Sequence, residues 1–423
     1  KAERIRSTKN STNYRSPIRL RSSGPEKNAT ATNTVNYWTG SNVCWLSWMP
    51  HAPEMRFRVA LLLSLCSALA GGSPLPDSTL GSYGLEARLT YGFLVAHRPM
   101  LRLLQEEHLR SFEVSLLFPS TGKKEWERGF RFPDRGLHLA IIDLGSRKLL
   151  GTGIAVYPFV DFPLFFGNDW SCRLRYGMGL GYVQHTFDPE ENYKNTALSS
   201  HLNGTIHFDL HVNKCIGQRG AFDAGIGITH YSNGATALPN LGINLAAAHI
   251  GYRRYFGERR ALHKETHDQR QLRPGMTLFL SGSLKEIYPP LGPLYFASTL
   301  SGDYLLPLNP KIDAAVGADL FYDASLRVRM EASEDVQQPV STNFRPGVHG
   351  GLQFNLDPLG LIFNLGYYPY TRFKDDGRYF HRIGLRYYFD RLFVCMNLKT
   401  HYARADFIEW GVGWRFRSTS PKP

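Results

Sequence analysis

The feature that most constrains this chain is a series of long segments in which apolar and polar side chains alternate. In SSHLNGTIHFDLHVNK (199–214), the apolar face of a predicted strand carries Leu202, Ile206, Phe208, Leu210 and Val212. The polar face of the same segment carries His201, Asn203, His207, Asp209 and His211. A strand of a soluble sandwich has about five or six residues, whereas about ten are needed to cross a bilayer at a tilt. The length of the alternation therefore favours membrane-spanning strands.

The same alternation recurs in CRLRYGMGLGYV (172–183), KIDAAVGADLFYD (311–323) and DFIEWGVGWRF (406–416). The chain is rich in residues typical of such strands, with 22 Tyr, 26 Phe and 40 Gly. We count about 14 to 16 strands and predict an all-β fold, a transmembrane antiparallel β-barrel with an apolar outer face and a polar, glycine-rich inner face. A large secreted β-sandwich is the alternative.

The strands fall into two halves of similar length, residues 80–256 and 275–416, which are separated by the polar segment 257–274. Residues 417–423 form a short tail. Each half ends in a similar hairpin, beginning THYSN in the first and THYARADF in the second, which suggests a duplication. We expect a single wide barrel rather than two tandem ones, because one shared sheet would leave no strand edge exposed to lipid.

The apolar run MRFRVALLLSLCSALAGG, which begins at Met55, predicts a secretory signal peptide over residues 55–70. Residues 1–54 are polar and without period, and we interpret them as a disordered or spurious extension. A lipoprotein anchor at Cys66 is disfavoured because the preceding Leu65 is bulky. Three cysteines remain downstream, at 172, 215 and 395; their spacing fits no metal motif, and single thiols are favoured over a disulfide.

The net charge of +13 does not indicate nucleic-acid binding, because much of the excess lies in the first 54 residues and no helix carries a basic stripe. Basic residues distributed over a membrane protein suit the phosphates of anionic lipids. We therefore expect a lipid partner and no nucleic acid.

One segment breaks the pattern in a way that indicates chemistry. In GIGITHYSNGATALPNLGIN (225–244), His230 and Ser232 continue the face that carries Ile226 and Ile228. Asn244, on the next strand, shares this apolar parity. Polar groups on a lipid-facing surface are costly and usually functional. A serine, a histidine and an orienting amide are the three components of a hydrolase triad. The alternative is a strand end at the membrane interface whose polar side chains are simply solvated.

The segment HYSNGATALPNLGIN resembles the outer-membrane lipid A 3-O-deacylase family, including its longer members, the acyloxyacyl hydrolases. The family motif, H-x-S-N followed by P-N-x-G, is matched by His230, Ser232, Asn233, Pro239, Asn240 and Gly242. FDPEENYKNTALSSHLN (187–203) also resembles the longer members. The sequence departs from the family at Asn244, where the deacylases carry a glutamate. The spacing of His230, Ser232, Asn233, Gly234 and Asn244 also resembles that of outer-membrane phospholipase A.

The resemblance implies a cofactor-independent esterase of the outer membrane that acts on lipid A or lipopolysaccharide. Together with the shared parity of the three residues, it predicts Ser232 as nucleophile, His230 as general base and Asn244 as orienter. The oxyanion and binding residues that it implies are Asn233, Gly234 and Asn240. The strand that ends near His230 is the seventh in our count, which would place the site at the outer rim of the barrel. A phospholipase A, or a porin or lipid-binding barrel without turnover, remains an alternative, and a homodimer remains open.

Two other groups of polar residues are less informative. We expect His201, His207 and His211 to be solvated in the lumen rather than to bind a metal. His401, Asp406 and Glu409 echo the first hairpin, but Ala403 stands where the serine would be, so a second active site is not expected.

Overall fold

The computed structural model describes residues 78–264, 273–402 and 404–417. The predicted extension (1–54), the signal peptide (55–70) and almost all of the tail lie outside the described residues, as does Ala403. Among the described residues, no helix is both long and apolar enough to cross a membrane.

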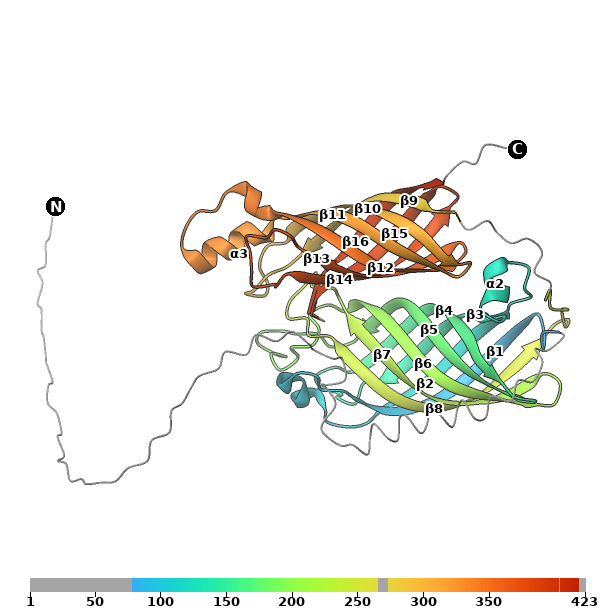
Figure 1. The fold of residues 1–423 in the computed structure, drawn as a ribbon. Coiled ribbons are helices and arrows are strands. Elements are labelled where there is room, and N and C mark those ends of the chain that lie inside the picture. The colour runs from blue at the N-terminus through green and yellow to red at the C-terminus, as the bar shows by residue number, and fades with distance from the viewer. Residues whose placement is uncertain (1–77, 265–272, 403, 418–423) are drawn as a thin grey trace, which may run out of the picture. The chain divides into compact units, whose positions relative to one another are not determined.

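The first eight strands form one closed antiparallel barrel, in which each strand pairs with its neighbours in sequence (Figure 1). The barrel closes where β8 pairs with β1, in an unbroken register from Tyr83 opposite Phe256 to Leu94 opposite Leu245. The strands are β1 (Tyr83–Leu94), β2 (Leu109–Pro119), β3 (Asp134–Asp143), β4 (Thr152–Phe166), β5 (Trp170–Val183), β6 (Leu202–Ile216), β7 (Gly220–Ser232) and β8 (Ile243–Phe256). The 3-10 helix η2 (Pro99–Leu104) and the short helix α2 (Glu125–Gly129) lie in its connections.

The last eight strands form a second closed antiparallel barrel (Figure 1). It closes between β16 and β9, where Arg417 lies opposite Gly275. Its strands are β9 (Gly275–Lys285), β10 (Tyr295–Asn309), β11 (Ile312–Asp323), β12 (Phe344–Leu356), β13 (Leu359–Tyr367), β14 (Tyr379–Phe389), β15 (Leu392–His401) and β16 (Arg404–Arg417). Helix α3 (Ser325–Glu334) and the 3-10 helix η3 (Val340–Asn343) connect β11 to β12.

The prediction of an all-β antiparallel barrel fold with about sixteen strands is confirmed, but the expectation of a single wide barrel is wrong. The two separate barrels also leave no strand edge unpaired, because β8 pairs with β1 and β16 pairs with β9. Closure within each half meets the requirement for paired edges as well as one large sheet would.

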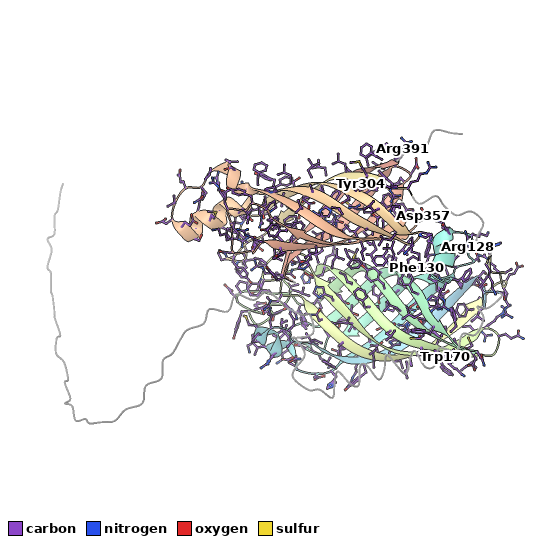
Figure 2. All side chains as sticks on the ribbon, in the orientation of Figure 1. Arg128, Phe130, Trp170, Tyr304, Asp357 and Arg391 are labelled. Atoms are coloured by element: carbon purple, nitrogen blue, oxygen red, sulfur yellow. The ribbon has the colours of Figure 1, made fainter. Side chains whose placement is uncertain are left out.

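The alternating pattern also predicts correctly which side chains face outward. On β7, Ile226 and Ile228 are 65% and 41% exposed, whereas Asp223 on the opposite face is buried. Figure 2 shows side chains on both sides of each barrel wall, and Tyr304 of β10 is among the exposed aromatic residues of the outer face. A sandwich, which buries its apolar faces between two sheets, does not fit this arrangement.

The lumen of the first barrel is filled by paired charges. Glu86 accepts a hydrogen bond from Arg175 at 2.7 Å, and Arg88 contacts Asp209 and Asp223 at 2.8 Å each. All five of these side chains are buried. An interior of eight strands is just wide enough for side chains to fill it, so these groups neutralise one another instead of meeting bulk water.

The expectation of solvated histidines is wrong for His207 and His211, which are buried in this network. His211 contacts Asp209 at 2.9 Å, and His207 contacts the hydroxyl of Thr229 at 2.9 Å. His201, by contrast, is exposed and contacts the carbonyl of Val183 at 2.9 Å. The described residues contain no group of three or more His, Cys, Asp or Glu side chains arranged to hold a metal ion.

The lumen of the second barrel is similarly packed. Asp406 forms ion pairs with Lys399 and Lys285, and Glu409 pairs with Arg382 at 3.0 Å. His401 lies beside Asp406 and is buried with it. These residues, which echo the first hairpin in sequence, are therefore part of a structural charge network. Cys215 and Cys395 are free thiols, as favoured from the spacing of the cysteines.

Candidate active site

The pairing of β7 with its two neighbours brings the polar residues of the motif together on the outer face. In the register of β7 and β8, His230 lies directly opposite Asn244. On the other side, Ser232 at the end of β7 lies opposite Gly204 of β6, which has no side chain. His230, Ser232 and Asn244 are all half-buried. The hydroxyl of Ser232 is therefore open on the β6 side, whereas Ile206 of β6 lies opposite His230.

The imidazole of His230 is held by the amide of Asn244. The Nδ1 atom of His230 lies 2.7 Å from the Oδ1 atom of Asn244. Since an amide oxygen can only accept, His230 donates from Nδ1 and keeps an unprotonated Nε2. This is the tautomer in which the imidazole can accept a proton from a serine hydroxyl.

The hydroxyl of Ser232 accepts hydrogen bonds from two N–H groups. The Nδ2 atom of Asn240 donates to Oγ at 2.9 Å, and the backbone N–H of Gly234 donates at 3.2 Å. Among the hydrogen bonds of the described residues, there is none between Ser232 Oγ and the His230 imidazole. Catalytic hydrogen bonds are often formed only once substrate is bound. With its lone pairs engaged by donors, the hydroxyl retains its own proton for transfer.

Asn233 has a different environment from the one that the resemblance implies. Its side chain is buried, and its Nδ2 atom donates to Ser200 Oγ at 3.0 Å and to the carbonyl of Ala237 at 2.9 Å. Both amide protons are thus used within the protein. Its backbone N–H donates to Asn240 Oδ1 at 3.3 Å, which orients the Asn240 amide toward Ser232. The side chain of Asn233 therefore braces the loop, and the donors to Ser232 Oγ are Asn240 and Gly234.

The connection between β5 and β6 (184–201) supports the loop between β7 and β8 (233–242). Its carbonyls at Thr196 and Ala197 accept from the N–H groups of Leu241 at 3.3 Å and Gly242 at 2.9 Å. Ser199 Oγ donates to the carbonyl of Pro239 at 2.7 Å. The segment FDPEENYKNTALSSHLN, which the sequence analysis identified, therefore holds residues 239–242 in place through these hydrogen bonds.

The same connection contains a local turn at Asp188. The backbone N–H groups of Glu191 and Glu190 donate to its carboxylate at 2.8 Å each, and they lower the pKa of Asp188. The carboxylate is thereby kept charged and committed to the turn.

One contact of the site was not predicted from the sequence. His97, in the connection that follows β1, lies with its Nδ1 atom 3.0 Å from the Nδ2 atom of Asn244. Its Nε2 atom lies 3.1 Å from the carbonyl of Leu241. His97 is 147 positions away from Asn244 in the chain, and no spacing or periodicity links the two. The contact arises because barrel closure pairs β1 with β8.

Two family models match the chain. The lipid A 3-O-deacylase (PagL) model matches residues 110–253, and the model of the acyloxyacyl hydrolase C-terminal domain matches residues 275–418. Together they span most of the chain, from β2 to β16. The chain belongs to the lipid A 3-O-deacylase family. It is therefore an ester hydrolase, and this deacylase acts on an ester-linked acyl chain of lipid A.

Several solved structures resemble this deacylase at low sequence identity. CdiB from Acinetobacter baumannii aligns at 8% identity and a TM-score of 0.17, over 79% of this chain and 60% of CdiB. The siderophore receptor PirA from Pseudomonas aeruginosa aligns at 9% identity and a TM-score of 0.19, over 80% and 81% of the two chains. A mutant of the Rh. blastica porin aligns at 10% identity and a TM-score of 0.18, over 79% and 99%. The sequence matches no curated protein.

Gly242 provides a first test of the site, because it packs against the imidazole. A Cβ atom at this position would lie 2.7 Å from Cε1 and 3.4 Å from Nε2 of His230, on a backbone with φ of +70°. We expect Gly242→Ala to lower the deacylation rate by roughly 100-fold, since displacements of about 1 Å can cost that much. The rate is measured from the release of acyl chains from lipid A.

The matched control for this variant is Gly217→Ala. Gly217 also has a positive φ, +62°, but nothing lies within 4 Å of the added Cβ. It therefore imposes similar backbone strain without touching the imidazole. If both variants lost activity equally, displacement of His230 would not be the cause.

Proposed function

We propose that this deacylase hydrolyses its lipid ester with a Ser-His-Asn triad on the membrane-facing surface of the first barrel. The observation that carries the proposal is the convergence of three groups on one outward face. Ser232 Oγ accepts from two N–H donors, His230 lies two residues before it, and Asn244 holds the His230 Nδ1 atom at 2.7 Å. We infer from this arrangement that Ser232 and His230 carry out acyl transfer, and that the hydrogen bond between them forms when substrate binds.

We further propose that the protein is embedded in the outer membrane. Its strands of 9 to 15 residues are long enough to cross a bilayer at a tilt, and large apolar side chains cover their outer faces. The substrate is then lipopolysaccharide, whose ester bonds would meet the rim at which β7 ends. A homodimer stays a prediction.

In the proposed reaction, Ser232 Oγ attacks the ester carbonyl carbon and transfers its proton to His230 Nε2. The tetrahedral adduct expels the sugar hydroxyl, whose oxygen takes that proton from the imidazolium. Water, activated by the same Nε2 atom, then hydrolyses the acyl-serine and releases the fatty acid. Asn244 fixes the orientation of the imidazole throughout but carries no charge to stabilise the imidazolium.

We assign the oxyanion donors to Asn240 Nδ2 and the N–H of Gly234. The developing oxyanion is bonded to the same carbon as Oγ, so donors that already converge on Oγ lie close to it. Preorganised donors of this kind contribute roughly 10²- to 10³-fold each to the rate. Asn233 supports them indirectly through the bond from its N–H to Asn240 Oδ1.

Asn240→Asp separates the two contacts of the Asn240 side chain, which are donation from Nδ2 to Ser232 Oγ and acceptance by Oδ1 from the Asn233 N–H. Aspartate keeps an oxygen for the Asn233 N–H but loses the Nδ2 donor and places a negative charge near the oxyanion. We expect kcat to fall by about 100-fold or more while the barrel folds normally. Full activity in this variant would remove Asn240 from the oxyanion site.

Mass spectrometry of lipids from cells that express the protein tests the substrate. Loss of a 3-hydroxyacyl chain from lipid A supports the deacylase with cleavage at the 3-position. Accumulation of lysophospholipid would support a phospholipase A, which the amide at position 244 favours. Unchanged lipids would indicate a barrel without turnover and contradict the proposal.

A further inference from the structure

We propose that His97 is a positioning residue that fixes the orientation of the Asn244 amide and, through it, the tautomer of His230. This inference rests on the triad proposed above. It adds to the triad, whose three residues lie on β7 and β8, a side chain from the connection after β1. The evidence is a continuous chain of hydrogen bonds from the Leu241 carbonyl to His230.

The direction of this chain is determined at its far end. The carbonyl of Leu241 can only accept, so the Nε2 atom of His97, 3.1 Å away, donates to it. A neutral imidazole with its proton on Nε2 has a lone pair on Nδ1. Nδ1 of His97 therefore accepts from the Nδ2 group of Asn244 at 3.0 Å.

The amide of Asn244 is consequently held in one of its two orientations. With Nδ2 toward His97, Oδ1 must point to His230, whose Nδ1 donates to it at 2.7 Å. The flipped amide would present an N–H group to Nδ1 of His230. The His230 imidazole would then accept at Nδ1 and carry its proton on Nε2. That tautomer cannot accept a proton from Ser232. A carboxylate needs no such control, since both of its oxygens accept.

The backbone around His97 is anchored to the strand that it serves. The N–H of Val95 donates to the carbonyl of Asn244 at 2.8 Å, and the N–H of His97 donates to the carbonyl of Val95 at 3.0 Å. At the other end, the N–H of Leu241 donates to Thr196 at 3.3 Å. His97 is exposed and packs against no core cluster, so its removal should not unfold the barrel.

The test compares His97→Ala and His97→Gln in the natural chain and in the Asn244→Asp background. In the natural chain, His97→Ala should lower kcat for lipid A deacylation roughly tenfold with KM unchanged, as expected for loss of one orienting hydrogen bond. His97→Gln should restore much of kcat, because its amide can both donate to Leu241 and accept from Asn244. In the Asn244→Asp background, His97→Ala should have little effect.

His108→Ala is the matched control. His108 is an exposed histidine near the same connection, stacked on Tyr91, and should be replaceable without loss of rate. An unchanged kcat in His97→Ala, or an equal loss in both backgrounds, would overturn the positioning role. Ser232→Ala distinguishes this failure from failure of the triad itself. If Ser232→Ala loses deacylation while His97→Ala keeps it, the triad stands and only the role of His97 is overturned.

Discussion

Ser232→Ala is expected to abolish release of the acyl chain while the barrel still folds. Removing a triad nucleophile typically lowers the rate by roughly 10⁴-fold or more, since no other group can form the acyl intermediate. Ser232 lies at the end of β7 and is half-buried on the outer face, where its hydroxyl fills no core. Lipid A mass spectrometry measures the activity, and the heat-dependent gel shift of the folded barrel measures folding.

Ser298→Ala is a suitable control for this variant. Ser298 is also a half-buried serine on the outer parity of a strand, but its hydroxyl donates to the backbone carbonyl of Ser281 in the second barrel. We expect it to fold and to deacylate lipid A at the natural rate. Deacylation by Ser232→Ala at a rate near that of Ser298→Ala would eliminate Ser232 as the nucleophile.

Much of the fold follows from the alternation of apolar and polar residues. Period two assigns each side chain to a face, and the turn between β7 and β8 then pairs neighbouring strands, so His230 and Asn244 were predicted on one surface. The number of barrels could not be predicted in this way. The alternation pattern would allow β8 to pair with either β1 or β9. Its pairing with β1 depends on how all eight strands of the first half curve into a barrel.

The parts of the site that escaped prediction depend on loop conformation and barrel closure. Asn233 matched the family motif, yet the loop folds so that its amide faces Ser200 and Ala237 inside the protein. His97 carries no sequence signal, because its contact requires β1 to close on β8. Likewise, His207 and His211 share the predicted lumen face, but their burial follows from the small diameter of an eight-stranded barrel.

Substitution of Asn244 is expected to cause the second large loss of deacylation rate, because the Asn244 side chain holds the orientation and tautomer of the imidazole. Asn244→Ala removes the acceptor that lies 2.7 Å from His230 Nδ1, so the ring can rotate and adopt the wrong tautomer. A misassigned tautomer costs up to about 10⁴-fold in serine hydrolases. We expect a loss of roughly 10³-fold. The strand itself should be unaffected, since the backbone carbonyl of Asn244 still accepts from Val95 at 2.8 Å.

Asn244→Glu distinguishes the two kinds of scaffold that the motif resembles. In the deacylase family a glutamate stands at this position, and a carboxylate both orients the imidazole and stabilises the imidazolium. We therefore expect the variant to retain a sizeable part of its deacylase activity, or to exceed the natural rate. In a phospholipase-like site built around a neutral amide, the added charge at the lipid face would be costly and would lower the rate. Acyl release from lipid A, compared among the natural protein, Asn244→Glu and Asn244→Ala, decides between them. An Asn244→Ala variant as active as the natural protein would show that the third member of the triad lies elsewhere on the outer face.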